Sequence, residues 1–165
     1  MDAQSLKQLV GVLDQQMLAA QALTLLLSRE RTLLTGEDAA AVEAAAAEKA
    51  TLLNRIESLE TDRRRVLAIA GHGATAAEMN RISRAPAGGA PASALQLQVG
   101  ERWQRLIDLM QQCREANEVN GAIVGLKQRQ IRQLLNILRT GREDDLTYGR
   151  GGRTQSGTAR GLARA

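Results

Sequence analysis

Aromatic residues are almost absent from this chain of 165 residues, which has no Phe, one Trp (Trp103) and one Tyr (Tyr148). A core without rings has to be built from aliphatic side chains and is thin, which favours elongated packed helices over a compact globule. The single Cys, Cys113, has no partner for an intramolecular disulfide. Its place on the apolar stripe of a predicted helix indicates a small core residue.

Long apolar runs are also missing. No run approaches the ~18–20 consecutive apolar residues that span a bilayer. The polar start Met1-Asp2-Ala3-Gln4 leads directly into a periodic helix, which is unlike a signal peptide. We therefore expect a soluble, cytoplasmic protein that does not insert into a membrane.

Motifs of catalysis are missing as well. The single His, His72, lies between two glycines without Cys or carboxylate at ligand spacing, which predicts a surface residue and no metal site. No His is placed to activate Cys113. The glycine pairs at 88–89 and 151–152 neither follow a strand nor precede a Gly-Lys-Ser/Thr motif, so neither is a phosphate loop. We expect no enzymatic activity, no metal and no cofactor.

The charge balance is basic, with a formal net charge of +4. Residues 141–165 hold five Arg and three acidic residues, whereas the rest of the chain mixes both signs, as solvated helix faces do. The run Arg63-Arg64-Arg65 is typical of such a solvated helix end. No basic stripe is interleaved with aromatics for base stacking, so we expect no nucleic-acid binding. Weak, salt-sensitive binding through the Arg-rich tail stays open as an alternative.

Apolar residues at spacings of three and four predict an all-α fold with three long helices over about 5–34, 38–70 and 94–140. Short connections make such helices an elongated antiparallel bundle over residues 1–140. Capping boxes at Ser5 and Thr75 would start the first helix and a short extra helix in the second connection, and Ser93 would cap the third long helix. Gly36 is suited to a left-handed cap. Residues 84–93 form a linker, and residues 141–165 form a disordered Gly/Arg-rich tail.

The third long helix changes character halfway. Asn117, Asn120 and Gly121 interrupt its apolar stripe with polar and small residues. An unpaired buried amide costs ~1–3 kcal/mol, so such residues have a purpose. Two purposes satisfy this argument equally. The amides could fix helix register within the bundle, or they could pair with the main chain of a bound segment that Gly121 allows to approach closely.

Beyond these residues the helix becomes more apolar. If it starts where the second helix ends, it runs out of neighbours near residue 125, and its aliphatic side chains are then exposed. A partner or self-association would cover them, and an amphipathic helix is the natural occupant of such a face. The aliphatic residues concerned are Ile123, Val124, Leu126, Ile131, Leu134, Leu135, Ile137 and Leu138.

The order of these features resembles the FlgN-type flagellar export chaperones. The resemblance rests on Lys49 before Leu52-Leu53, on Trp103-x-x-Leu106, on Asn117-x-x-Asn120-Gly121 followed by Leu134-Leu135, and on Tyr148-Gly149 in the tail. It covers nearly the whole chain, and the Asn-x-x-Asn-Gly element with the terminal Tyr-Gly is its most specific part.

This resemblance implies a cytoplasmic, non-enzymatic chaperone of type III flagellar export. Such proteins hold the C-terminal segments of the hook–filament junction proteins FlgK and FlgL, prevent their premature assembly and deliver them to the export gate. In the family the C-terminal helix takes the cargo, and a tail tyrosine contacts the cytoplasmic domain of the gate. Here Tyr148 matches the tyrosine, and the cargo residues would be Asn117, Asn120, Gly121, Ile123, Val124, Leu126, Ile131, Leu134, Leu135 and Leu138. The alternative is a structural coiled-coil protein that self-assembles without cargo, and a homodimer fits either function.

Overall fold

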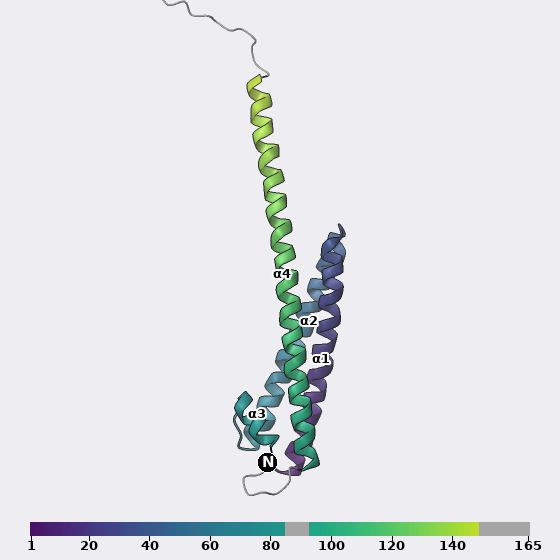
Figure 1. Cartoon of the computed structure of the whole chain (residues 1–165), viewed down its shortest axis with the longest axis vertical. Coiled ribbons are helices and arrows are strands. Elements are labelled where there is room, and N and C mark those ends of the chain that lie inside the picture. The colour runs from purple at the N-terminus through teal and green to yellow at the C-terminus, as the bar shows by residue number, and fades with distance from the viewer. Residues whose placement is uncertain (85–92, 149–165) are drawn as a thin grey trace, which may run out of the picture. The chain divides into compact units, whose positions relative to one another are not determined.

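The computed structural model describes residues 1–84 and 93–148, with side-chain surroundings for residues 1–84, 93–137 and Arg139. Within these ranges it contains four helices: α1 (Ala3–Thr35), α2 (Ala39–Ile69), α3 (Ala76–Ile82) and α4 (Ala94–Tyr148) (Figure 1). The expected all-α fold is therefore confirmed. The chain divides into two compact units, Met1–Val124 and Gly125–Ala165, which are described separately.

Side-chain caps define where the helices start. Asp38 and Thr75 cap α2 and α3, and Ser93 forms a complete capping box with Gln96, since each side chain accepts a hydrogen bond from the backbone N–H of the other residue. The box predicted at Ser5 is wrong. The backbone N–H of Ser5 instead donates to Asp2 Oδ1 at 2.7 Å, so Asp2 is the cap and α1 starts earlier than predicted.

Two of the predicted helix ends also need correction. Gly36 is not left-handed, because its φ is −87°, whereas Gly71 after α2 has a φ of 74°. The third long helix does not end at Gly141 but continues to Tyr148. One glycine inside a helix costs only about 1 kcal/mol relative to Ala and does not by itself end it. Most of the predicted linker, residues 85–92, and the predicted tail from residue 149 onward lie outside the described residues.

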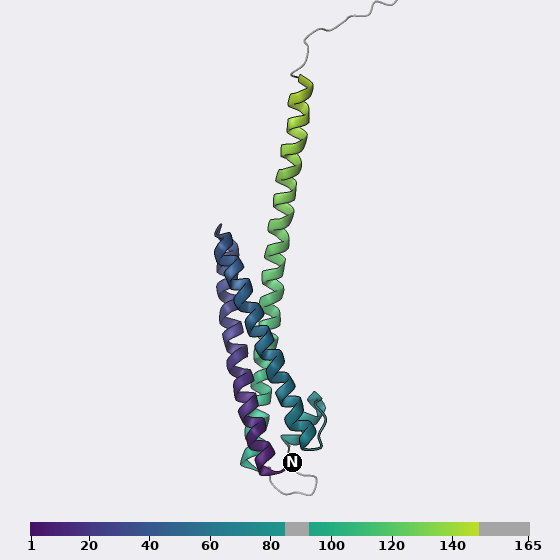
Figure 2. The same ribbon diagram turned by 180° about the vertical axis from the view of Figure 1, so that it is seen from behind.

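Polar contacts show how the long helices run in the first unit. Arg55 donates to Gln15 and Lys49 to Glu30, so α2 runs antiparallel to α1. Arg102 donates to Asp14 at 2.7 Å, and further along both helices the Cys113 sulfur lies 3.2 Å from Thr24 Oγ1. The start of α4 therefore runs parallel to α1. Both views show α1 beside α2 and the start of α4 (Figures 1 and 2).

The core of the first unit is aliphatic, as the composition predicts. Its main cluster joins all four helices through fully buried side chains of Leu9, Leu67, Met79 and Val99. A smaller cluster contains Leu23, Leu27 and Cys113, which confirms Cys113 as a small core residue. Burying each such Leu contributes roughly 1.5–3 kcal/mol, so a thin core still stabilises the bundle.

The apolar composition of α1 resembles that of a membrane span. In the part of the chain that the structure describes, α1 is long and apolar enough to cross a bilayer by length and composition. The core helix of a soluble protein passes the same test. In α1 the apolar residues supply the buried face of the bundle, including Leu6, Leu13, Leu23 and Leu27.

The short helix α3 packs on the bundle through its buried residues Met79 and Ile82. The predicted surface residue His72 is in fact partly buried there, with its Nδ1 2.6 Å from Glu78 Oε1. Hydrogen bonds from Arg81 and then His72 lower the pKa of Glu78 to about 2. The carboxylate is thus held in its charged form, and it links the connection before α3 to the helix itself.

At Gly100 the helix α4 lies close to Ser83, because a Cβ built on Gly100 would lie 2.9 Å from the Cβ of Ser83. We predict that Gly100→Ala lowers the free energy of unfolding by about 1 kcal/mol, since the overpacking outweighs the gain in helix propensity. Gly11→Ala is the matched control in α1, where an added Cβ meets nothing within 4 Å. It should raise stability by roughly 0.5–1 kcal/mol. Urea denaturation checks both, and equal effects of the same sign would contradict the close contact.

Candidate partner-binding surface

Asn120 is a buried polar residue close to the C-terminal end of the first unit. Its side chain is 2% exposed. Its Nδ2 donates to the backbone oxygen of Leu27 and to Glu30 Oε2, both at 2.8 Å, and its Oδ1 accepts from Arg31 Nε at 3.3 Å. Both ends of the amide are therefore paired with α1.

Lys49 extends this network to α2. Its Nζ lies 2.6 Å from Glu30 Oε1, so the buried Glu30 carboxylate bridges a cation from α2 and an amide from α4. Lys49 also donates to Asn117 Oδ1 at 3.5 Å, and Asn117 is exposed. We call Glu30, Lys49, Asn117 and Asn120 the Asn120 network. It joins three helices at one level of the bundle and fixes their register.

The two predicted asparagines thus differ. The amide of Asn120 is buried and paired within the first unit, which is what the first of the two purposes, fixing helix register, requires. Gly121 is exposed, and a Cβ added to it would meet nothing within 4 Å. The packing of the first unit does not explain this glycine.

The aliphatic residues of the candidate surface are largely exposed. Ile123 is partly buried, and Val124 is 37% exposed. In the second unit the exposed fractions rise above one half for Leu126, Ile131, Leu134 and Leu135, and Ile137, outside the predicted cargo set, reaches 65%. Leu138 and Tyr148 belong to α4, and Tyr148 is its last residue, but their side chains lie outside the described part.

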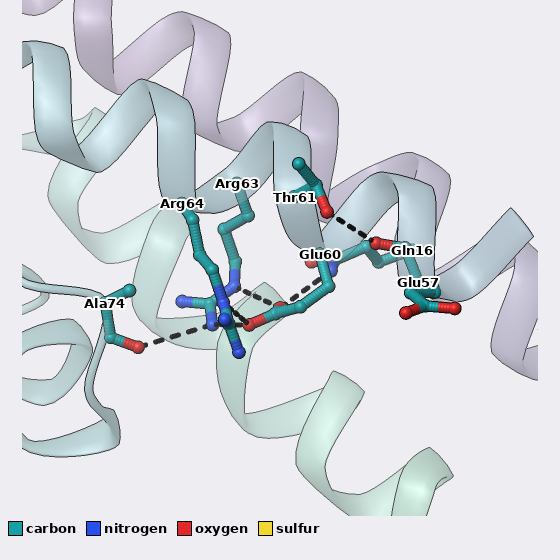
Figure 3. Close-up of polar contacts among 7 residues, drawn as sticks. All are labelled: Gln16, Glu57, Glu60, Thr61, Arg63, Arg64 and Ala74. Carbon is teal, nitrogen blue, oxygen red and sulfur yellow. Dashed lines mark hydrogen bonds and ion pairs between the residues drawn. The ribbon is translucent and has the colours of Figure 1, made fainter. Parts of the chain in front are cut away.

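A second polar cluster corrects the interpretation of the arginine run. Arg64 and Arg65 are exposed, but Arg63 is 3% exposed. Its guanidinium donates twice to Glu60 and once to the backbone oxygen of Ala74, as Figure 3 shows. It also lies 4.9 Å from the ring centroid of Trp103.

Burial opposes ionisation of Glu60, but the hydrogen bonds from Arg63 and Arg64 outweigh it and hold the pKa of this carboxyl below its usual value. Gln16 in α1 also donates to Glu60. The cluster lies beside a half-open groove of about 400 Å³ that Ile56, Leu106 and Met110 help to line. A buried ion pair adds little to the net free energy of folding, but its geometry restricts how the helices that carry it can pack. Arg63 therefore positions α2 against α4 and the connection before α3.

Sequence reasoning singled out Lys49 but missed Glu30 and Glu60, and it placed Arg63 on a solvated helix end. A signal existed for Glu30, which is three residues after Leu27 and four before Leu34 and so lies on the apolar stripe of α1. Arg63 carried no comparable signal, because its burial depends on Trp103, forty residues away in the sequence. Among the described residues, no group of three His, Cys, Asp or Glu side chains is placed to hold a metal ion.

Comparison with known proteins identifies a family. The family model described as FlgN protein matches residues 1–156. The chain belongs to the FlgN family. This is the flagellar export chaperone family for FlgK and FlgL, and it is not an enzyme family. No curated protein and no solved structure gives a significant match.

The Asn120 network yields a direct test in this FlgN-family chain. We predict that Asn120→Ala lowers the free energy of unfolding by about 1–3 kcal/mol, because it leaves buried polar groups of Leu27 and Glu30 without their amide partner. Asn117→Ala is the matched control on the exposed side of the same helix and should change stability by less than about 0.5 kcal/mol. Chemical denaturation measures both, and equal losses would show that the buried network does not fix the register.

Proposed function

We propose that this chain binds the C-terminal amphipathic helices of the hook–filament junction proteins FlgK and FlgL on the apolar face of α4, prevents their premature assembly and delivers them to the export gate. The observation that carries the proposal is the exposure of Leu126, Ile131, Leu134 and Leu135 in one continuous helix. Family membership supports a chaperone role in flagellar export.

The energetics favour a helical occupant. Each of these leucines contributes roughly 1.5–3 kcal/mol when it is fully buried, and a cargo helix gains in the same way from covering its own apolar stripe. Ile131, Leu134, Leu135 and Leu138 follow one another at spacings of three, one and three residues, which is the pattern of one helix face. Cargo that is covered in this way cannot use the same face to pair with another subunit.

The predicted site residues take different parts in this proposal. Ile123, Val124, Leu126, Ile131, Leu134, Leu135 and Leu138 form the cargo face. Asn120 is left out, since both ends of its amide are paired inside the bundle. Asn117 and Gly121 are exposed next to that face, and a helix pays about 1 kcal/mol for Gly relative to Ala. Close approach of a cargo backbone explains why glycine stands there.

Tyr148 supplies the second step. It is the last residue of α4, and we propose that it docks the complex on the cytoplasmic domain of the export gate. The chain has no phosphate-loop motif, so release does not use ATP bound to this protein. These steps belong to a cytoplasmic protein without enzymatic activity.

Self-assembly is the second candidate, because the same exposed leucines would also pair two copies of the chain. A mass that rises with concentration, in the absence of any binding to FlgK or FlgL segments, would favour it. A homodimer that dissociates when cargo is added remains compatible with the chaperone function.

The cargo face is tested by Leu134→Asp, which should weaken binding to a C-terminal FlgK peptide roughly 100-fold or more, because a charge replaces a buried leucine. Gln133→Asp is the matched control, since it makes the same charge change on the adjacent exposed residue and should leave most of the affinity. Titration calorimetry gives both affinities. Equal losses would mean that charge, and not the apolar contact, decides binding.

Tyr148→Ala should leave the affinity for the FlgK peptide unchanged but reduce binding of the complex to the purified cytoplasmic domain of the export gate about tenfold or more, as loss of an aromatic anchor does. Thr147→Ala serves as the neighbouring control. If Tyr148→Ala lost cargo to the same extent as Leu134→Asp, cargo and gate would not have separate sites.

A further inference from the structure

The formal charge of the chain is divided very unevenly. Residues 1–118 hold 13 basic and 15 acidic residues, a balance of −2. Residues 119–142 hold five basic residues and not one Asp or Glu, a balance of +5. Residues 143–165 add four Arg and three acidic residues. The basic character of the chain thus lies mainly on the stretch of α4 that carries the exposed aliphatic residues.

The arginines border the apolar face. Arg132 and Arg139 stand three residues before and four residues after Leu135, which places them along one edge of that face. Arg129 precedes Arg132 by three residues and extends the same row of arginines. All three are exposed. Any helix that covered the face would bring its own flanking residues alongside these guanidiniums.

We infer that the partner helix carries acidic residues beside its apolar stripe, and that complementary charge selects it and sets its orientation on α4. The inference rests on the proposed function and adds the chemical class of the cargo segment. Arg129 and Arg132 have no acidic neighbour three or four residues away on their own helix, because residues 119–142 contain none. A partner that lacked acids would place these charges against neutral or like groups.

A protein helix fits this face better than an anionic membrane. Helices that lie in a membrane interface combine their basic face with aromatic anchors such as Trp or Phe. Residues 119–142 contain no aromatic residue. Their apolar side chains are instead the Leu, Ile and Val that pack in helix-to-helix contacts. Membership of a protein-export chaperone family points the same way.

The experiment compares three synthetic amphipathic peptides with the full-length chain by titration calorimetry. All three share one Leu/Ile stripe, and their flanking positions are all Glu, all Gln or all Lys. The C-terminal FlgK segment and vesicles with anionic phospholipid are titrated alongside them. We expect the Glu peptide to bind about tenfold more tightly than the Gln peptide and the Lys peptide to bind most weakly. The preference should shrink at roughly 0.5 M salt, where screening is short-ranged.

Charge reversal locates the effect. Arg129→Glu with Arg132→Glu should invert the order, so that the Lys peptide binds best. The matched control, Arg84→Glu with Arg105→Glu, makes the same change in net charge on exposed residues of the first unit and should keep the original order. Inversion by both pairs would mean that net charge alone decides, which overturns the inference. Circular dichroism confirms that each variant is folded.

The remaining outcomes separate the inference from the proposed function. Equal affinity for the three peptides, together with tight binding of the FlgK segment, would overturn the acidic partner and leave the chaperone function standing. No binding of the FlgK segment or of any peptide to the folded chain would reject the proposed function itself. Vesicle binding that exceeds all peptide binding would replace the protein partner with a membrane surface.

Discussion

The pairing of Asn120 with α1 is the interaction on which the arrangement of the long helices depends. An aliphatic core without aromatic rings has few shapes that distinguish one helix register from the next. A buried amide that donates to Leu27 and Glu30 restricts this freedom, because a shift of α4 by one turn would separate the amide from both acceptors. Lys49 completes the charge balance from α2, so the same site fixes all three helices.

The cluster of Glu60, Arg63 and Trp103 restricts the packing of α2 against α4 in the part of the first unit where α3 packs. There the guanidinium holds the carboxylate, the ring and the backbone oxygen of Ala74 at once. The two polar sites therefore join the helices at two levels, one beside the main aliphatic cluster and one beside the smaller cluster.

Function follows from what the first unit leaves uncovered. The buried apolar residues of the first unit stabilise its fold, whereas Leu126, Ile131, Leu134 and Leu135 are each more than half exposed. In a member of an export chaperone family, an apolar helix face of this kind, bordered by arginines without acidic neighbours, is best explained by a cargo helix of complementary chemistry. The binding energy would come from the leucines and the selectivity from the charges.

The amino-acid sequence alone was enough to predict the all-α class, the helix boundaries to within two residues except at the end of α4, the caps at Thr75 and Ser93, and the apolar character of the later part of α4. These features are local, because period, caps and composition act over a few residues along the chain. Tertiary structure was needed to show that the Asn120 amide is buried and paired, since its partners Leu27 and Glu30 lie about ninety residues earlier. It also buried Arg63 and brought Gly100 against Ser83, because each contact joins segments whose proximity no periodic pattern encodes.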